Sequence, residues 1–245
     1  MSKLALHGKT TLVTGGARRI GRAIALALAR AGADVTITYR NSRSDAEQTV
    51  LQIQGLGRCA QAIECDVRAE ASVRAAVAAT AAFHGGIDIL VNNAGVFETA
   101  PLDQITVAEW DAVFETNTRG PFLFAREALP HLRAAHGRII NLGSLGGLRA
   151  WSTHGHYCAS KAALHMLTQV MARAFAPDVA VNCVAPGWID QGDKPQEASA
   201  HYAAKTPLQR NGTAEDVAES VLYFAANAAF VTGQILPIDG GLGLY

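Results

Sequence analysis

Residues 10–21, with the sequence TTLVTGGARRIG, decide the fold of this chain. The β-branched run at 10–14 predicts a strand that stops at Gly15 and Gly16, and the Ala/Leu-rich residues 20–31 predict a helix that ends at Gly32. Glycines in such a turn let backbone N–H groups approach a phosphate, and the positive end of the helix dipole attracts it. Because the turn lies in the first strand–helix unit, it predicts a binding site for the pyrophosphate of a dinucleotide.

The alternation of strands and helices continues along the chain. We expect further strands at residues 34–39, 59–65, 87–91, 138–142, 179–184 and 234–237, and further helices at 44–53, 69–83, 156–174 and 214–226. A long helix is expected at 107–135 with an interruption at 117–121, and residues 187–211 are expected to be irregular. Strands that alternate with helices form parallel sheets through right-handed crossovers. The prediction is an α/β fold: residues 1–245 form a single domain with a Rossmann-like, doubly wound parallel sheet and helices on both faces.

The composition excludes several classes of protein. Apolar residues make up 49% of the 245 residues, which is enough for a sizeable core, and the 21 basic residues balance the 21 acidic ones. A chain without a basic surplus is not expected to bind nucleic acid. The four cysteines lack zinc-binding spacing, and no apolar run is long enough for a signal peptide or a membrane span. We therefore expect a cytoplasmic protein without a metal site, a membrane partner or a nucleic-acid partner.

The end of the second predicted strand indicates which dinucleotide binds. Proteins that bind NAD place Asp or Glu there, because a carboxylate accepts hydrogen bonds from the ribose 2′-hydroxyl. This chain has Arg40, Asn41 and Ser42 at that position, and Arg18 in the glycine-rich turn could reach the same corner. Arginine pairs with a 2′-phosphate, which a carboxylate would repel. The predicted cofactor is therefore NADPH/NADP⁺; the alternative for Arg40 is a solvated surface position.

Tyr157 and Lys161 form the predicted reactive pair. A spacing of four places both side chains on one face of the helix at 156–174. A free tyrosine has a pKa of about 10, and a cation about 4–6 Å away favours the phenolate. We therefore expect Lys161 to lower the pKa of Tyr157, so that the phenol exchanges a proton with a substrate oxygen near neutral pH. Ser144 does not match a hydrolase nucleophile, because Leu142 occupies the first position of the required Gly-x-Ser-x-Gly pattern.

Further motifs occur in the order known from one family. They are TGxxxxIG at 14–21, Cys65-Asp66-Val67, Asn92-Asn93-Ala94-Gly95, Asn117, Ser144, Tyr157-x3-Lys161, Pro186-Gly187, and Val231-Thr232-Gly233-Gln234 followed by Asp239-Gly240-Gly241. With these motifs the chain resembles the short-chain dehydrogenase/reductase family over nearly its whole length. Ser144 also precedes Tyr157 by 13 residues, which is the separation in that family.

The resemblance implies four catalytic residues. Tyr157 would be the general acid in reduction and the base in the reverse direction. Lys161 would lower the pKa of Tyr157 and hold the nicotinamide ribose. Ser144 would hydrogen-bond the carbonyl oxygen and stabilise the developing alkoxide charge. Asn117 would hold a water that links Lys161 to solvent.

The resemblance and the phosphate turn together imply the cofactor contacts. Asp66 would contact the adenine, Asn93 the adenosine ribose side, and the Ile189 backbone would lie near the nicotinamide carboxamide. The complete predicted set is Gly15, Arg18, Arg19, Ile20, Arg40, Asn41, Ser42, Asp66, Val67, Asn93, Ala94, Gly95, Tyr157, Lys161, Pro186, Gly187 and Ile189.

Two positions depart from the commonest family pattern. Arg19 stands where most members have glycine, and Phe97 matches an aromatic residue; both features resemble pteridine reductases and dihydromonapterin reductases. A ring at Phe97 could sandwich a flat pterin against the nicotinamide, although packing explains it equally well. Ser144, however, stands where that group has an aspartate that helps deliver a proton to nitrogen, and a serine suits a carbonyl oxygen.

We therefore expect an enzyme that reduces a small-molecule carbonyl, either a ketone or a 3-oxoacyl group, by hydride transfer from NADPH. Pterin reduction is the second interpretation, and a non-catalytic NADP(H)-binding module is the third. Ser144, Phe97 and Trp188 are the predicted substrate contacts, and residues 188–206 are expected to be a mobile substrate loop. The usual assembly of the family implies a homo-oligomer, a homotetramer in preference to a dimer.

Overall fold

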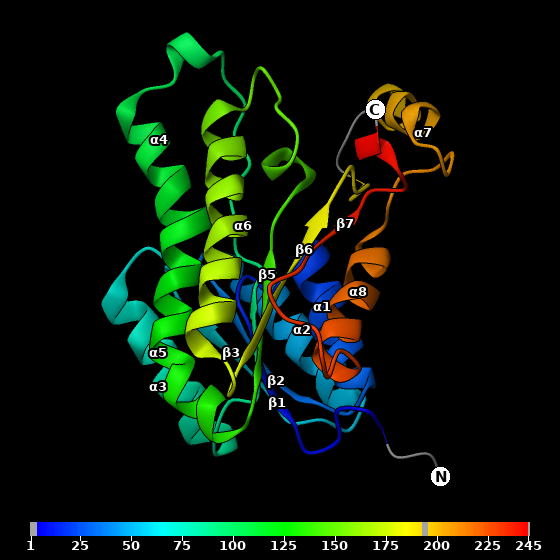
Figure 1. The fold of residues 1–245 in the computed structure, drawn as a ribbon. Coiled ribbons are helices and arrows are strands. Elements are labelled where there is room, and N and C mark those ends of the chain that lie inside the picture. The colour runs from blue at the N-terminus through cyan, green and yellow to red at the C-terminus, as the bar shows by residue number, and fades with distance from the viewer. Residues whose placement is uncertain (1–3, 193–195, 245) are drawn as a thin grey trace.

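A seven-stranded parallel sheet forms the centre of the molecule (Figure 1). The computed structural model describes residues 4–192 and 196–244. The strands are β1 (Thr10–Val13), β2 (Asp34–Tyr39), β3 (Ala60–Glu64), β4 (Ile89–Asn92), β5 (Arg138–Leu142), β6 (Ala180–Pro186) and β7 (Ile235–Ile238). Their order is β3-β2-β1-β4-β5-β6-β7, and every neighbouring pair is parallel. The predicted Rossmann-like, doubly wound sheet is confirmed.

Helices cover both faces of this sheet (Figure 1). One face carries α1 (Arg19–Arg30), α2 (Arg43–Gly55) and α8 (Ala214–Ala226), and the other carries α3 (Glu70–His84), α5 (Gly120–Ala134) and α6 (Gly155–Phe175). Each face encloses its own apolar core, one around Ile24 and Ile37 and the other around Leu90 and Phe124, all completely buried. Removal of these side chains from water is the main force that holds the layers together.

The direction of the strands determines where the site forms. Because all seven strands are parallel, their carboxyl ends lie at one edge of the sheet, and the loops that follow them meet there. The strand order reverses between β1 and β4. From β1 the chain first adds β2 and β3 on one side, and it then returns to add β4 to β7 on the other side. Ligands of doubly wound sheets bind in the crevice at this switch point.

A π-helical turn replaces the predicted interruption of the long helix. The helix α4 (Val107–Phe114) continues through η2 (Glu115–Arg119), a π-helix, into α5. The Gly120 N–H bonds to the Glu115 carbonyl, five residues back, and the Thr116 hydroxyl donates to the Ala112 carbonyl at 2.8 Å. A threonine hydroxyl that bonds to a backbone carbonyl competes with the backbone N–H groups of the helix and so disturbs the regular helical hydrogen bonds. The expected distortion around Asn117 is therefore confirmed.

The expectation of an irregular segment at 187–211 is wrong in part. Helix α7 (Gln196–Lys205) forms within it and lies beyond the carboxyl end of β6 (Figure 1). Alanine favours helix, and Glu197 in the first turn suits the positive end of the helix dipole. Residues 193–195, which belong to the predicted mobile loop 188–206, lie outside the described residues, and the mobility of that loop stays a prediction. Within the described ranges, no helix combines the length and apolar character needed to cross a membrane.

Candidate active site

The turn between β1 and α1 leaves the first helical N–H groups open to an anion. Gly15 has a φ of +63°, and a Cβ on Gly21 would lie only 2.2 Å from the Gly15 carbonyl oxygen, so both positions require glycine. No side chain caps α1 at its N-cap residue Arg18, and its first turn contains no acidic residue. A helix N-terminus of this kind fits the pyrophosphate of a dinucleotide.

Thr14 and Asn93 hold this turn against the end of β4. The Thr14 hydroxyl accepts hydrogen bonds from the N–H groups of Asn93 and Ala94, both at 3.0 Å. The Asn93 amide nitrogen donates to the carbonyls of Thr14 at 2.9 Å and Gly15 at 3.0 Å. The side chain of Asn93 thus shapes the phosphate turn, and its expected proximity to the adenosine ribose stays a prediction.

The end of the cleft beyond this turn is basic. Arg18 and Arg40 line it, and Arg18 forms a 3.7 Å ion pair with Asp45, in which both side chains are exposed. Asp66 is the only acidic residue among the described residues that line the cleft. An arginine-rich corner of this composition fits a 2′-phosphate.

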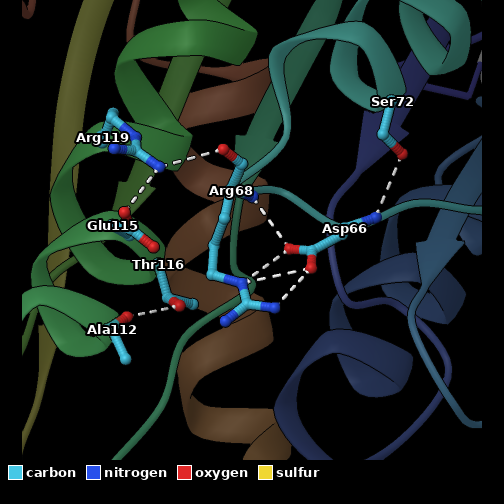
Figure 2. A network of polar contacts seen from close by, with 7 residues as sticks. All are labelled: Asp66, Arg68, Ser72, Ala112, Glu115, Thr116 and Arg119. Atoms are coloured by element: carbon cyan, nitrogen blue, oxygen red, sulfur yellow. Dashed lines mark hydrogen bonds and ion pairs between the residues drawn. The ribbon is translucent and has the colours of Figure 1, made fainter. Parts of the chain in front are cut away.

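A network of polar contacts fixes Asp66 (Figure 2). The Arg68 guanidinium donates to both carboxylate oxygens, at 2.9 Å from Nε and 2.6 Å from Nη2, and the Arg68 N–H adds a bond of 3.0 Å. These hydrogen bonds lower the pKa of Asp66 to about 2. Arg119 donates to the Arg68 carbonyl at 3.1 Å and pairs with Glu115 at 2.9 Å, which ties the segment around Asp66 and Arg68 to η2. Arg68 and Arg119 were not predicted from the sequence, because no motif marks a contact between residues 51 positions apart.

Tyr157 and Lys161 lie one turn apart on α6, as predicted, but burial controls their pKa values. The Lys161 ammonium lies 5.9 Å from the centre of the Tyr157 ring and donates to the Leu142 carbonyl at 2.7 Å. Burial lowers the pKa of Lys161 to about 8 and raises the pKa of Tyr157 to about 12. The expectation of a lowered tyrosine pKa is thus wrong for this arrangement, because burial disfavours the phenolate and a hydrogen bond with Ser144 offsets only part of that effect.

Ser144 follows β5 and lies beside the phenol. Its hydroxyl accepts the Gly146 N–H at 3.0 Å, and a side-chain hydrogen bond with Tyr157 offsets part of the burial effect on the tyrosine pKa. Underneath, the Nε2 atom of His165 lies 3.4 Å from the Ser144 backbone nitrogen. A Cβ on Gly143 would lie 2.2 Å from that Nε2 atom, so only glycine fits above the imidazole. Burial lowers the pKa of His165 to about 4, and the neutral ring can therefore accept the Ser144 N–H.

Asn117 lies completely buried beneath the cleft. Its amide nitrogen donates to the Val96 carbonyl at 3.0 Å and to the Ser160 hydroxyl at 3.1 Å, and its amide oxygen accepts the Val96 N–H at 2.9 Å. The side chain therefore joins η2 to the loop after β4 and to α6. The predicted role of Asn117 in holding a water stays a prediction.

One continuous cleft of about 1390 Å³ brings the predicted residues together. Every predicted cofactor-binding residue lines it, as do Phe97 and Trp188, whereas Asn117 and Ser144 are buried directly beside it. The cleft is also lined by residues that were not predicted as site residues, among them Arg149, Trp151, His154 and Tyr202. Trp151 and His154 lie six and three positions before Tyr157, so their proximity in sequence to the reactive pair was the available signal.

Comparison with known proteins identifies the family. Residues 15–243 match the family model described as enoyl-(acyl carrier protein) reductase. The short chain dehydrogenase mdpC of Emericella nidulans is 38% identical, and the match covers 96% of each chain. The chain belongs to the short-chain dehydrogenase/reductase family. A second member, the 3-oxoacyl-[acyl-carrier-protein] reductase FabG of Staphylococcus aureus, is 37% identical over 96% of this chain and 98% of its own.

Solved structures of short-chain dehydrogenases/reductases have the same fold. A short chain dehydrogenase from Burkholderia cenocepacia J2315, crystallised in complex with NADP, superposes with a TM-score of 0.92 at 40% identity, over 97% of this chain and 99% of its own. Members of the family use nicotinamide cofactors, and the predicted class of enzyme, a nicotinamide-dependent oxidoreductase, is confirmed.

Proposed function

We propose that this short-chain dehydrogenase/reductase reduces a ketone-type carbonyl with NADPH. The observation that carries the proposal is the meeting of Tyr157, Lys161 and Ser144 where β5 and α6 reach the cleft. A phenol, an ammonium and a hydroxyl at one point can donate a proton and hydrogen-bond an oxygen that gains negative charge.

The cofactor supplies a hydride to the carbonyl carbon when it is bound. NADPH is favoured over NADH because Arg18 and Arg40 line the end of the cleft where the adenosine would bind. An enzyme that binds NADH would have a carboxylate there to accept hydrogen bonds from the ribose 2′-hydroxyl. The similar structure from Burkholderia cenocepacia, which holds NADP, supports the same choice.

The chain's own residues would supply the proton and the charge stabilisation. The Tyr157 hydroxyl would protonate the carbonyl oxygen as the carbon–oxygen double bond becomes a single bond, and the Ser144 hydroxyl would hydrogen-bond the same oxygen. The resulting phenolate would be stabilised by the Lys161 ammonium before a proton returns from solvent. Asn117, through the π-helical turn, would keep a water beside Lys161 for that return.

From the usual assembly of the family we propose a homotetramer, in preference to a dimer, and exposed apolar side chains support an interface between subunits. Phe122 on α5 is 42% exposed, and Met166 and Val170 on α6 are 60% and 53% exposed, which is unusual for such apolar side chains on two neighbouring helices. Light scattering after size-exclusion chromatography would give the mass in solution, and the mass of a monomer or a dimer would contradict this assembly.

The test of the proposed function is the oxidation of NADPH, followed by its absorbance, with one panel of ketones, quinones and 3-oxoacyl thioesters and a second panel of dihydropterins. We expect turnover of carbonyl compounds. Tyr157→Phe should reduce kcat at least about 100-fold while the dissociation constant of NADPH stays within about threefold. Tyr223→Phe, on the exposed side of α8, is the matched control and should leave both values unchanged. Full activity of Tyr157→Phe would exclude the proposed acid.

Pterin reduction stays the second candidate, because Phe97 lies in the cleft with its ring centre 4.8 Å from that of Tyr157. Turnover of pterins without turnover of any carbonyl compound would establish this function in place of the first. NADPH binding without turnover of either panel would instead indicate a non-catalytic NADP(H)-binding module.

A further inference from the structure

Aromatic rings surround the reactive phenol at the substrate end of the cleft. Phe97, Trp151, His154, Trp188 and Tyr202 all line this region, which therefore contains two of the three tryptophans in the chain. Aromatic residues make up only 7% of the sequence, so rings are concentrated at this end of the cleft.

The first group of rings comes from the loops after β4 and β5. Phe97 stacks on His154 with centroids 4.7 Å apart and meets Tyr157 edge-on at 4.8 Å. Trp151 lies nearly parallel to Tyr157, at 10° and 6.3 Å. These are the separations and angles of favourable aromatic pairs, so the ring cluster is preorganised around the proton donor.

Hydrogen bonds fix the orientation of His154. Its two ring nitrogens each lie 3.0 Å from a threonine hydroxyl, Nε2 from Thr99 and Nδ1 from Thr153. With both nitrogens engaged, the imidazole presents its flat faces, and one of them is stacked against Phe97. Phe97 nevertheless keeps 47% of its surface exposed, so the protein leaves much of this ring open in the cleft.

A second group of rings comes from the other side of the sheet edge. Trp188, after β6, stacks on Tyr202 of α7 at 3.8 Å and 13°. The substrate end of the cleft thus has aromatic residues on segments after β4, β5 and β6, beside aliphatic residues such as Val96, Leu145 and Leu242.

From this arrangement we infer that the substrate is a planar aromatic ketone or quinone, with its carbonyl beside Tyr157 and its ring system against Phe97. The inference rests on the proposed carbonyl reduction and specifies its substrate class. A flat π-system gains stacking energy on these rings, whereas a flexible saturated chain gains only apolar contact and loses rotational freedom on binding. Phe97 and His154 are therefore specificity-determining residues.

Two ketones with the same carbon skeleton test the inference. 2-Tetralone contains a fused aromatic ring, and trans-2-decalone is its saturated counterpart. We expect the wild-type enzyme with NADPH to show a kcat/KM about tenfold or more higher for 2-tetralone. Calorimetry with the NADP⁺-saturated enzyme supplies a second readout, in which 2-naphthol should bind about tenfold more tightly than trans-decahydro-2-naphthol.

Variants test whether the rings cause this preference. Phe97→Leu keeps an apolar side chain without the ring. It should reduce the 2-tetralone preference to about threefold or less, because kcat/KM should fall more for 2-tetralone than for trans-2-decalone. Phe230→Leu is the matched control, because Phe230 is fully exposed and does not line the cleft. The Phe230→Leu variant should leave kcat/KM for both ketones unchanged.

The outcomes separate failure of the inference from failure of the proposed function. Equal or better reduction of trans-2-decalone, or turnover of 3-oxoacyl thioesters without 2-tetralone, would overturn the substrate class and leave carbonyl reduction in place. A preference that survives Phe97→Leu and a matching His154→Leu variant would also overturn it. Reduction of no carbonyl compound by an enzyme that binds NADPH would overturn the proposed function itself.

Discussion

The ammonium nitrogen of Lys161 lies 2.7 Å from the carbonyl oxygen of Leu142, the last residue of β5. This bond anchors α6 to the carboxyl end of the strand that precedes Ser144. Burial holds the pKa of Lys161 at about 8, so the folded protein retains a charged group inside the sheet edge at neutral pH at some cost in stability.

The pH dependence of stability should reveal this cost. Between pH 8 and about pH 10.5 the unfolded chain keeps the Lys161 proton while the folded chain releases it, so stability contributed by this residue rises with pH. From pH 7 to pH 10 the rise should be about 2–3 kcal/mol, measured as the unfolding free energy of the wild type minus that of Lys161→Met. A difference that is flat over this range would contradict the lowered pKa.

His165 should make the stability of the folded protein decrease at acid pH. Its pKa is about 4 in the folded protein and about 6.5 in an unfolded chain, so only the unfolded chain binds the proton between these values. Stability should therefore fall by about 3 kcal/mol as the pH decreases from 7 to 4. His165→Gln keeps an acceptor for the Ser144 N–H and should lose this acid dependence in denaturant titrations. If His165→Gln loses stability in acid as the wild type does, groups other than His165 cause the acid dependence.

The phosphate turn should not tolerate a side chain at Gly21. A Cβ there would lie 2.2 Å from the Gly15 carbonyl oxygen, so Gly21→Ala must displace the turn. We expect a loss of about 1–3 kcal/mol of stability and at least tenfold weaker NADPH binding. Gly55→Ala is the matched control, because nothing lies within 4 Å of its added Cβ, and it should be neutral or slightly stabilising.

Arg40→Asp should change the preferred cofactor from NADPH towards NADH. The substitution removes a cation that lines the cleft and introduces a carboxylate, which repels a 2′-phosphate and accepts bonds from a 2′-hydroxyl. The ratio of kcat/KM for NADPH to that for NADH should fall at least tenfold. Arg30→Asp, at the far end of α1, controls for the change in net charge. An unchanged ratio would show that Arg40 does not read the phosphate.

The sequence predicted the sheet well because strand residues repeat a local pattern. β2, for example, occupies the predicted residues 34–39, since a run of β-branched residues between polar ends carries its own signal. The spacing of Tyr157 and Lys161 similarly placed both residues on one helix face. The pKa of Tyr157 could not be predicted in the same way, because burial depends on loops that are distant in sequence.

Contacts between segments that are distant in sequence account for the other differences between the predicted and the observed structure. Arg119 reaches the backbone of Arg68 across 51 positions, and no local pattern announces such a bond. Helix α7 was missed because its polar residues hide the helical period, although its alanines favour a helix. The aromatic character of the cleft emerges only when the loops after three strands come together.

The positions of the tryptophans give this enzyme a built-in optical probe. Trp151 and Trp188 line the cleft, while Trp110 lies on α4, stacked on Phe114. Indole emission overlaps the absorption band of reduced nicotinamide, so excitation energy should pass from the two cleft tryptophans to NADPH and not to its oxidised form. In a Trp110→Phe protein, ultraviolet fluorescence would then follow each turnover directly, without a label.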